Sequence, residues 1–248
     1  MAEPAFRLIA DSIRADITAR RLVEGDRLPT VRDLAARYEV PIGTVTRALD
    51  LLRAEGVIVS HHGRGLYVRS FARIVRSSPG RLAKSHWGAG HAIQDADTGD
   101  RVRVVHVEVS EVPAPPWAAE AFALPEGVSV LARVRRFAVD DRIVQLATSY
   151  LPLAVVHTVP SVAYTGPGPG GIYARMAEAG LEPVRFRERI RSRTPTSDEA
   201  TMLALPTGVA VHEITRWAWT HDGQCVEVNR MILDASAYDL EYLFSSEG

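Results

Sequence analysis

The residues of this chain best suited to binding a ligand are arginines at strand-like spacing. Arg133 and Arg135 alternate within the stretch 129–139, so in a strand their side chains would share one face. Two guanidinium groups on one face can hold a phosphate or a carboxylate through paired hydrogen bonds. The same pattern also suits an exposed edge strand that is protected by charge. The pair therefore predicts an anion-binding site, with a charged edge strand as the alternative.

Two other polar features lie further along the chain. Glu227 and Asn229 alternate in the strand-like stretch 224–233 and would also share a face. A glycine-rich turn at 166–171 ends at Gly171, directly before a helix-like stretch. The backbone N–H groups at the start of a helix bind anions readily, so this turn is a second candidate for anion binding.

The sequence offers little for catalysis. It holds no nucleophile motif, no cluster of metal ligands and no glycine-rich loop of the nucleotide-binding type. Its one cysteine, Cys225, cannot form a disulfide within the chain or a cysteine-rich metal site. Its one lysine, Lys84, lies in a segment without periodicity, which argues against a Schiff-base enzyme. We therefore expect no catalytic residue, no metal and no cofactor.

A further group of polar residues lies near the N-terminus. Val45, Leu49 and Leu52 form the apolar stripe of a helix that starts at Pro41 and ends near Gly56. With that stripe facing inward, the polar side chains at the front of the helix are Thr44, Thr46 and Arg47. Side chains at the N-terminal end of such a helix can reach bases or phosphates in the major groove of DNA.

Two other helices precede this one. The first follows Pro4, and the second begins at Thr30, with Asp33 three residues later as in a shortened capping box. The stretches 57–59 and 66–68 then predict a two-stranded hairpin. Three helices followed by one hairpin is the order of a winged helix-turn-helix domain.

The loop of the predicted hairpin is polar and rich in glycine. Gly63 and Gly65 leave its tip without side chains, so its backbone can approach a duplex closely. Arg64 lies between them and can enter a narrow minor groove, where the negative potential is enhanced.

The run LPTVRDLAARYEVPIGTVTRALDLLRAEGVIVSHHGRGLYV resembles the GntR family of bacterial regulators. The resemblance covers residues 4–69 and implies binding to double-stranded DNA, with Arg32 as the family's DNA-contacting arginine. One position departs from the family, which commonly has Ser-Arg where this chain has Ile42 and Gly43. The resemblance therefore implies a DNA interface formed by Arg32, Thr44, Thr46, Arg47, Gly63, Arg64 and Gly65.

Beyond residue 86, strand-like and helical stretches alternate. We expect strands at 101–109, 129–139, 143–151, 185–193, 209–220 and 224–233, and helices at 116–122, 172–179 and 197–203. This order predicts an α+β domain built on a mainly antiparallel sheet.

This half is similar to the UTRA domain of the HutC-type branch of GntR regulators, a ligand sensor with a chorismate-lyase-like fold. The similarity spans residues 87–244 and is carried by ARVRRFAVDDRIVQLATSYLP, GGIYARMAEAGLEP and SDEATMLALPTGVAVHEITRWAWTHDGQCVEVNRMIL. It implies an effector site formed by Arg133, Arg135, Gly171, Glu227 and Asn229. Gly171 stands where many relatives have a serine, and Ala147 replaces an acidic residue. Both changes argue against simply assigning an amino-sugar phosphate as the effector.

The net charge of −1 is unevenly distributed, since the first 86 residues are net basic and the remainder net acidic. This is expected if only the first part meets a polyanion. We predict a DNA-binding domain at 1–69, a linker at 70–86 and an effector-binding and dimerisation domain at 87–248. No apolar run is long enough for a membrane helix, and the single cysteine favours the reducing cytoplasm.

These features predict a sequence-specific transcription regulator that binds a pseudo-palindromic operator as a homodimer. We expect a repressor that a small polar or anionic metabolite releases from double-stranded DNA. Two alternatives stay open. One is a constitutive repressor whose C-terminal domain only dimerises, and the other, less favoured, is an enzyme of the lyase-like fold.

Overall fold

The computed structural model describes residues 4–61, 63–69, 71, 73–140, 142–166, 170–205 and 208–243, except for the side chain of Asp100. The chain divides into two compact units. The first comprises the residues up to Arg73 and the short piece Leu205–Val209, and the second comprises the rest. Of the glycine-rich turn expected at 166–171, the residues 167–169 lie outside the described part.

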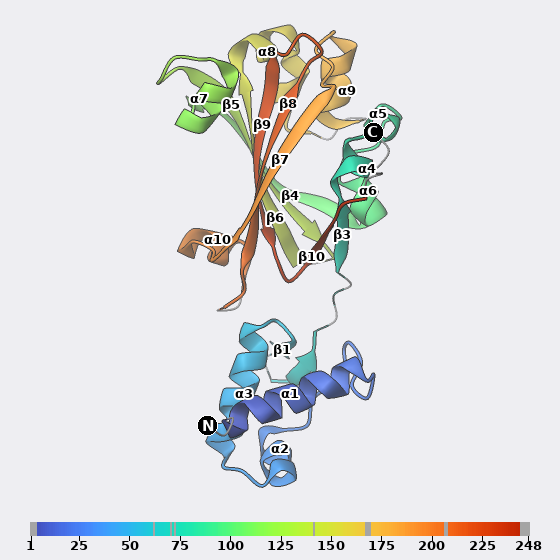
Figure 1. The fold of residues 1–248 in the computed structure, drawn as a ribbon, viewed down its shortest axis with the longest axis vertical. Coiled ribbons are helices and arrows are strands. Elements are labelled where there is room, and N and C mark those ends of the chain that lie inside the picture. The colour runs from blue at the N-terminus through green and yellow to red at the C-terminus, as the bar shows by residue number, and fades with distance from the viewer. Residues whose placement is uncertain are drawn as a thin grey trace. The chain divides into compact units, whose positions relative to one another are not determined.

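The first unit is a winged helix-turn-helix, as the sequence predicts (Figure 1). Its helices are α1 (Ala5–Thr18), α2 (Val31–Tyr38) and α3 (Ile42–Ala54), and its antiparallel hairpin is β1 (Ile58–His61) with β2 (Gly65–Val68). The apolar stripes of all three helices meet in one core, in which Ile13, Leu34 and Leu49 are almost fully buried. The predicted capping box is present at α2, where the Thr30 hydroxyl accepts a hydrogen bond from the Asp33 backbone N–H at 3.2 Å.

The second unit is built on a six-stranded antiparallel sheet with the strand order β4-β5-β6-β9-β8-β7 (Figure 1). Its strands are β4 (Val102–Pro113), β5 (Ser129–Val139), β6 (Arg142–Pro152), β7 (Arg185–Arg193), β8 (Val211–Trp219) and β9 (Cys225–Asp234). This confirms the α+β class and the mainly antiparallel sheet. A separate parallel pair joins β3 (Ile74–Ser77) to β10 (Tyr238–Glu241).

Helices lie on both faces of this sheet. The helices of this unit are α4 (Ser78–Leu82), α5 (Lys84–Trp87), α6 (Asp95–Thr98), α7 (Pro116–Phe122), α8 (Leu153–Thr158), α9 (Gly171–Glu178) and α10 (Ser197–Met202). The helices α8 and α9 pack on the face that carries Leu131 and Leu151. Helix α7 packs on the other face, which carries Val130 and Val228. The cavity described below lies on the face covered by α9.

The linker expected at 70–86 is shorter in the structure, because residues from Ile74 onward belong to the second unit. They form β3, α4 and part of α5, and three of their polar side chains are buried, namely Arg76 (0% exposed), Arg81 (1%) and Ser78 (5%). The linker prediction came from the serines, proline and glycine of this stretch and from its lack of a sustained periodicity. The partners of the buried side chains lie far away in the sequence, and local periodicity cannot reveal such contacts.

Within the described ranges, no helix is both long and apolar enough to span a membrane.

Candidate nucleic-acid interface and ligand cavity

Helix α3 presents a polar front opposite its buried stripe. Val45, Leu49 and Leu52 are buried, whereas Thr46 and Arg47 are exposed and Thr44 is half-buried. The Thr46 hydroxyl donates to the Ile42 carbonyl at 3.1 Å, within its own helix. The predicted polar residues of this helix therefore do face outward together, close to its N-terminal end.

Two exposed arginines belong to the predicted interface, one on α3 and one on α2. Arg47 lies over the ring of Phe6 in α1, with its guanidinium carbon 4.5 Å from the ring centre, and Arg32 is exposed in the first turn of α2. Neither makes an ion pair with a described residue. Stacking on an aromatic ring orients a guanidinium group while leaving its N–H donors available, which suits contact with phosphates or bases.

Gly43 occupies the position where the sequence departs from the family pattern. A Cβ atom added there would meet no atom within 4 Å. The missing arginine is therefore not excluded by crowding, because the front of α3 has room for a side chain.

The wing is held by hydrogen bonds within the hairpin. Gly63 and Gly65 have positive φ angles of 72° and 112°, in the region that favours glycine. The Arg64 backbone N–H donates to the His61 carbonyl at 2.9 Å, and the Tyr67 hydroxyl donates to the Arg64 carbonyl at 3.3 Å. The Arg64 side chain is exposed, as the sequence predicts.

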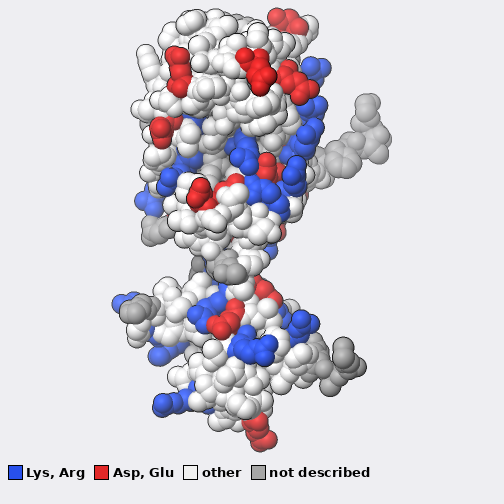
Figure 2. All heavy atoms as spheres, turned by 90° about the vertical axis from the view of Figure 1, so that its left-hand side faces the viewer, with Lys and Arg blue, Asp and Glu red and all other residues white. Residues whose placement is uncertain are grey.

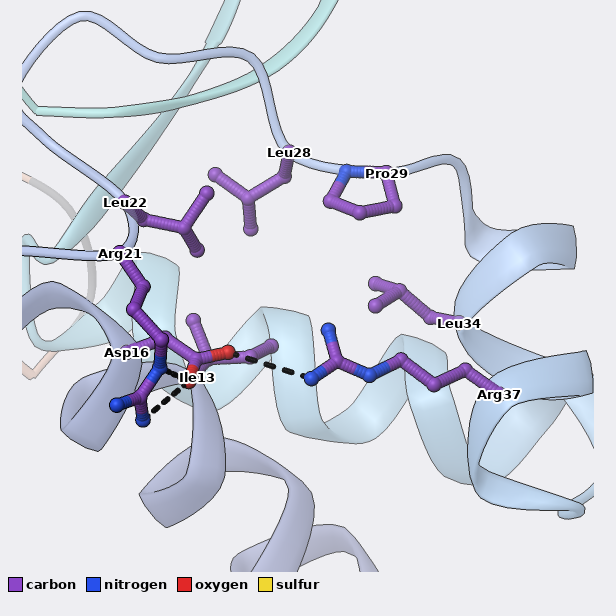
Figure 3. A pocket seen from close by; sticks show the side chains of 8 residues that line it. All are labelled: Ile13, Asp16, Arg21, Leu22, Leu28, Pro29, Leu34 and Arg37. Carbon is purple, nitrogen blue, oxygen red and sulfur yellow. Dashed lines mark hydrogen bonds and ion pairs between the residues drawn. The ribbon is translucent and has the colours of Figure 1, made fainter.

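A small pocket of about 210 Å³ lies between α1 and α2 (Figure 3). Asp16 extends into it from α1 and accepts a hydrogen bond from Arg21 Nε at 2.8 Å. Arg37, at the end of α2, lies 3.5 Å from the same carboxylate. This carboxylate therefore ties the end of α2 to α1, which helps fix the helix that carries Arg32.

The second unit contains a cavity of about 880 Å³. Its wall comes from β4, β5, β8, β9, the segment before α6 and the start of α9. Four of the five predicted effector residues line it: Arg133, Arg135, Gly171 and Glu227. The fifth, Asn229, lies just behind the wall, where its side-chain amide donates to Ser149 Oγ at 3.0 Å and to Glu227 Oε1 at 3.5 Å.

A polar row crosses the sheet on this face. Residues that lie directly opposite one another on neighbouring strands make up the row, which runs from β5 to β7 through Arg133, Ser149, Asn229, Arg216 and Glu188. Such a row within an otherwise apolar sheet is costly unless its members find partners. Its members therefore mark the part of the sheet that is suited to binding rather than to packing alone.

The two predicted arginines have unfilled hydrogen-bonding capacity. Arg133 is 4% exposed and donates from Nη2 to the Tyr164 carbonyl at 2.9 Å, and Arg135 donates from Nη2 to Ser149 Oγ at 2.8 Å. Among the described residues, Nε and Nη1 of Arg133 and Nε of Arg135 have no acceptor. Burial, and then the charge of Arg135, lower the pKa of Arg133 to about 10. An anion bound in the cavity would accept hydrogen bonds from the unpaired N–H groups, and its charge would offset the cost of burying the two arginines side by side.

Glu227 is fully buried and has several donors around it. The Tyr173 hydroxyl donates to it, and Arg216 Nη2 lies 3.5 Å away. Burial alone would raise the pKa of Glu227, but Arg216 and hydrogen bonds from Ser149 and Tyr173 hold it below its ordinary value. The carboxylate therefore stays ionised and can accept hydrogen bonds from a ligand.

Arg216 is a cavity residue that sequence reasoning missed. It is 1% exposed, and its Nε and Nη1 have no acceptor among the described residues. The sequence did offer one signal for it, because Arg216 is a charged residue within the mainly apolar strand-like stretch 209–220. Its neighbours Asn229 and Glu188 could be found only once the strand order was known.

The charges that line the cavity favour an anionic ligand. Five arginines face two carboxylates in the lining, namely Arg103, Arg133, Arg135, Arg175 and Arg216 against Asp95 and Glu227. At the start of α9, Gly171 has a φ of 67°, and a Cβ there would meet nothing within 4 Å. No cluster of three or more metal-ligating side chains occurs in the described part of the chain.

Two family models match the chain. The model described as "Bacterial regulatory proteins, gntR family" matches residues 7–68, and that of the UTRA domain matches residues 97–239. An HTH-type transcriptional regulator of Streptomyces coelicolor is 34% identical over 90% of this chain and 86% of its own length. An HTH-type transcriptional regulator of Mycobacterium tuberculosis is 27% identical over 91% and 80%.

Solved structures share the fold over almost the whole chain. A GntR-family transcriptional regulator aligns over 99% of both chains, with a TM-score of 0.63 and 24% identity. PhnF from Mycobacterium smegmatis aligns over 96% of this chain and all of its own, with a TM-score of 0.59 and 20% identity.

Proposed function

Because the chain belongs to the GntR family of bacterial regulators and carries a UTRA domain, it is a DNA-binding transcription regulator and not an enzyme, and we propose that it is an effector-released repressor. In this proposal it acts in the bacterial cytoplasm, as a homodimer of the HutC type. An anionic or strongly polar metabolite bound in the cavity of the second unit lowers its affinity for the operator.

The proposed DNA interface combines the front of α3, the start of α2 and the wing. Thr44, Thr46 and Arg47 read base edges, while Arg32 contacts DNA from α2. The wing residues Gly63, Arg64 and Gly65 approach the minor groove. A two-fold dimer presents two such surfaces, so the proposed operator is a pseudo-palindrome.

The single observation that carries the effector proposal is the set of unfilled guanidinium donors around the cavity. Arg133, Arg135 and Arg216 each have buried N–H groups without an acceptor among the described residues. Leaving a buried donor unsatisfied costs about 1–3 kcal/mol, more for a charged group, so an anion that accepts from them gains that energy on binding. Glu227 and Asn229 then recognise hydroxyl or amino groups of the same ligand, and the Gly171 backbone borders it.

Release from DNA requires more than tight binding. The effector must prefer a form of the dimer whose two DNA-binding units are wrongly spaced for the operator, because a ligand shifts a conformational equilibrium only by its differential affinity. In this proposal such a reorientation changes how the first unit is connected to the second.

A thermal-shift screen of anionic metabolites on the full chain tests this proposal. A true effector should raise the unfolding temperature, because it binds the folded state, and should also lower operator affinity in a titration. If some anions stabilise the protein while operator affinity stays constant, the cavity binds ligands without regulating DNA binding. If none of a broad panel stabilises it, the constitutive repressor with a dimerising C-terminal unit is favoured instead.

A further inference from the structure

Strand β7, at one end of the six-stranded sheet, carries arginines at alternate positions. The four exposed ones, which we call the arginine ladder, are Arg185, Arg187, Arg189 and Arg191. Alternate side chains of a strand share a face, and Glu188 between them points to the cavity side, where it lies opposite Arg216. The arginine ladder therefore lies on the other face of the sheet and is not part of the proposed effector site.

Two tryptophans of β8 lie beneath the arginine ladder. The guanidinium carbon of Arg187 is 4.2 Å from the ring centre of Trp217, and that of Arg189 is 5.4 Å from the same ring. The guanidinium carbon of Arg185 is 5.0 Å from the ring centre of Trp219. Stacking of this kind orients a guanidinium group and leaves its N–H donors available. A row of side chains that is already oriented loses less entropy when it binds a partner.

The charge of the arginine ladder is not neutralised within the described part of the chain, where none of its four members forms an ion pair. The next arginine on the same face, Arg193, is by contrast held by Glu199 at 2.7 Å and Glu213 at 2.5 Å. Strand β7 holds five of the fourteen arginines between residues 87 and 248, although that part of the chain is net acidic. In Figure 2, basic side chains form a column along one side of the larger unit. The net charge of this unit therefore conceals a concentrated basic strip.

We propose that the arginine ladder binds the phosphate backbone of duplex DNA, independently of base sequence. Its four side chains span about 20 Å, because an antiparallel strand rises about 3.4 Å per residue. One strand of B-DNA presents a phosphate about every 3.4 Å along the helix axis, so about six phosphates lie within that span. Guanidinium groups match the geometry of phosphate oxygens. Salt screens charges beyond about 8 Å, which limits repulsion from acidic side chains elsewhere on the unit.

The arginine ladder suits a duplex better than a single strand. Proteins that bind single-stranded nucleic acids stack the bases on exposed aromatic rings. Trp217 is only 5% exposed and is covered by arginines, so it offers no such platform. The chain is a DNA-binding regulator, and duplex DNA is therefore a polyanion that it meets. Contacts to phosphates add affinity without reading sequence, so the arginine ladder strengthens binding at the operator and elsewhere alike.

Titration of the full chain with a duplex of random sequence tests the proposal. The affinity is measured by fluorescence anisotropy over a range of NaCl concentrations. The variant Arg187→Gln with Arg189→Gln removes two charges from the arginine ladder and should bind this duplex more weakly. The slope of log affinity against log salt should become less steep by about 2 for each bound copy, because each phosphate contact contributes about 0.9 to it.

Two matched variants separate the arginine ladder from net charge and from folding. Lys84→Gln with Arg101→Gln removes two charges from side chains of the same unit that are 67% and 40% exposed. This variant should keep the slope of the unmodified protein. Arg187→Lys with Arg189→Lys keeps the charges and should also keep the slope, and circular dichroism should be unchanged in all three variants.

Three results would overturn the assignment. The first is an unchanged slope in Arg187→Gln with Arg189→Gln. The second is an equal loss in Lys84→Gln with Arg101→Gln, which would make the effect one of net charge, or a loss that the lysine variant shares. The third is normal DNA binding by the glutamine variant together with lost binding of a polyglutamate peptide that the unmodified protein holds, which would make the arginine ladder a site for an acidic protein. The proposed function is tested separately, because the probe contains no operator and no effector.

Discussion

Arg76 of β3 and Glu188 of β7 form a buried ion pair, with Nη2 to Oε1 at 2.7 Å and Nη1 to Oε2 at 3.0 Å. The Ser78 hydroxyl donates to the same carboxylate at 2.6 Å. Glu188 also lies directly opposite Arg216 in the sheet, so it is the last member of the polar row that begins at Arg133. The strand that follows residues 69–73 is thereby tied to the row that borders the cavity.

Replacing this carboxylate should destabilise the protein in a pH-dependent way. Burial would raise the pKa of Glu188, but the hydrogen bonds and charge of Arg76 lower it from 4.5 to about 2. A lowered folded-state pKa means that the stabilisation is fully present above the ordinary pKa and is lost as the pH falls through about 2. Glu188→Gln should therefore lower the free energy of unfolding at neutral pH by up to about 3 kcal/mol.

Urea unfolding between neutral pH and pH 3 measures this effect. The gap between Glu188→Gln and the unmodified protein should narrow as the solution becomes more acidic. Glu126→Gln, which alters an exposed carboxylate of the same unit, is the control and should show little change. A gap that is absent, or that widens in acid, would show that the ion pair does not stabilise the fold in this way.

Arg32→Ala and Arg47→Ala should each abolish specific operator binding without unfolding the first unit. Both side chains are exposed, and loss of a bidentate base contact costs about 1–3 kcal/mol per site, which a symmetric dimer incurs twice. Gel-shift titration, together with circular dichroism, measures the effect. Arg53→Ala, in the last turn of α3 where Arg53 pairs with Asp50, serves as the control. Unchanged operator affinity in either of the first two variants would remove that residue from the interface.

Gly43→Arg should be tolerated and should change the preferred operator. The added side chain meets open space, and replacing a helical glycine removes a cost of about 1 kcal/mol, so the unfolding temperature should rise slightly. An arginine at the front of α3 can also donate two hydrogen bonds to a guanine. Selection from random DNA should recover half-sites that differ from those of the unmodified protein. Identical half-sites would place position 43 away from the base edges.

The double variant Arg133→Ala with Arg135→Ala should bind operator normally but no longer respond to the effector. Both changes remove donors from the cavity while leaving the first unit untouched. Arg136→Ala is a matched control. Arg136 directly follows Arg135 in β5, and its side chain points to the other face of the sheet. A normal response to an identified effector would refute the pocket assignment, and loss of operator binding would make the two arginines structural.

The sequence predicted those features that depend on local spacing. The start of α2 at Thr30 and the shared face of Arg133 and Arg135 follow from capping and from strand alternation, and the structure has both. The sequence could not predict that Arg216 lies beside these two arginines. Strand β8 is brought to the site only because β6 pairs with β9, and these two strands are far apart in the chain. For the same reason Arg76 was assigned to a linker, since its partner Glu188 lies 112 residues away.

Selection from random duplex DNA by the purified full chain tests the central claim most directly. The account predicts enrichment of an inverted repeat with two equivalent half-sites, bound with an affinity that falls steeply as salt rises, because arginine–phosphate contacts release counterions. Neither Arg32→Ala nor Arg47→Ala should retain that preference. No enrichment over random DNA, or enrichment of a single unrepeated site bound by one copy, would contradict the account.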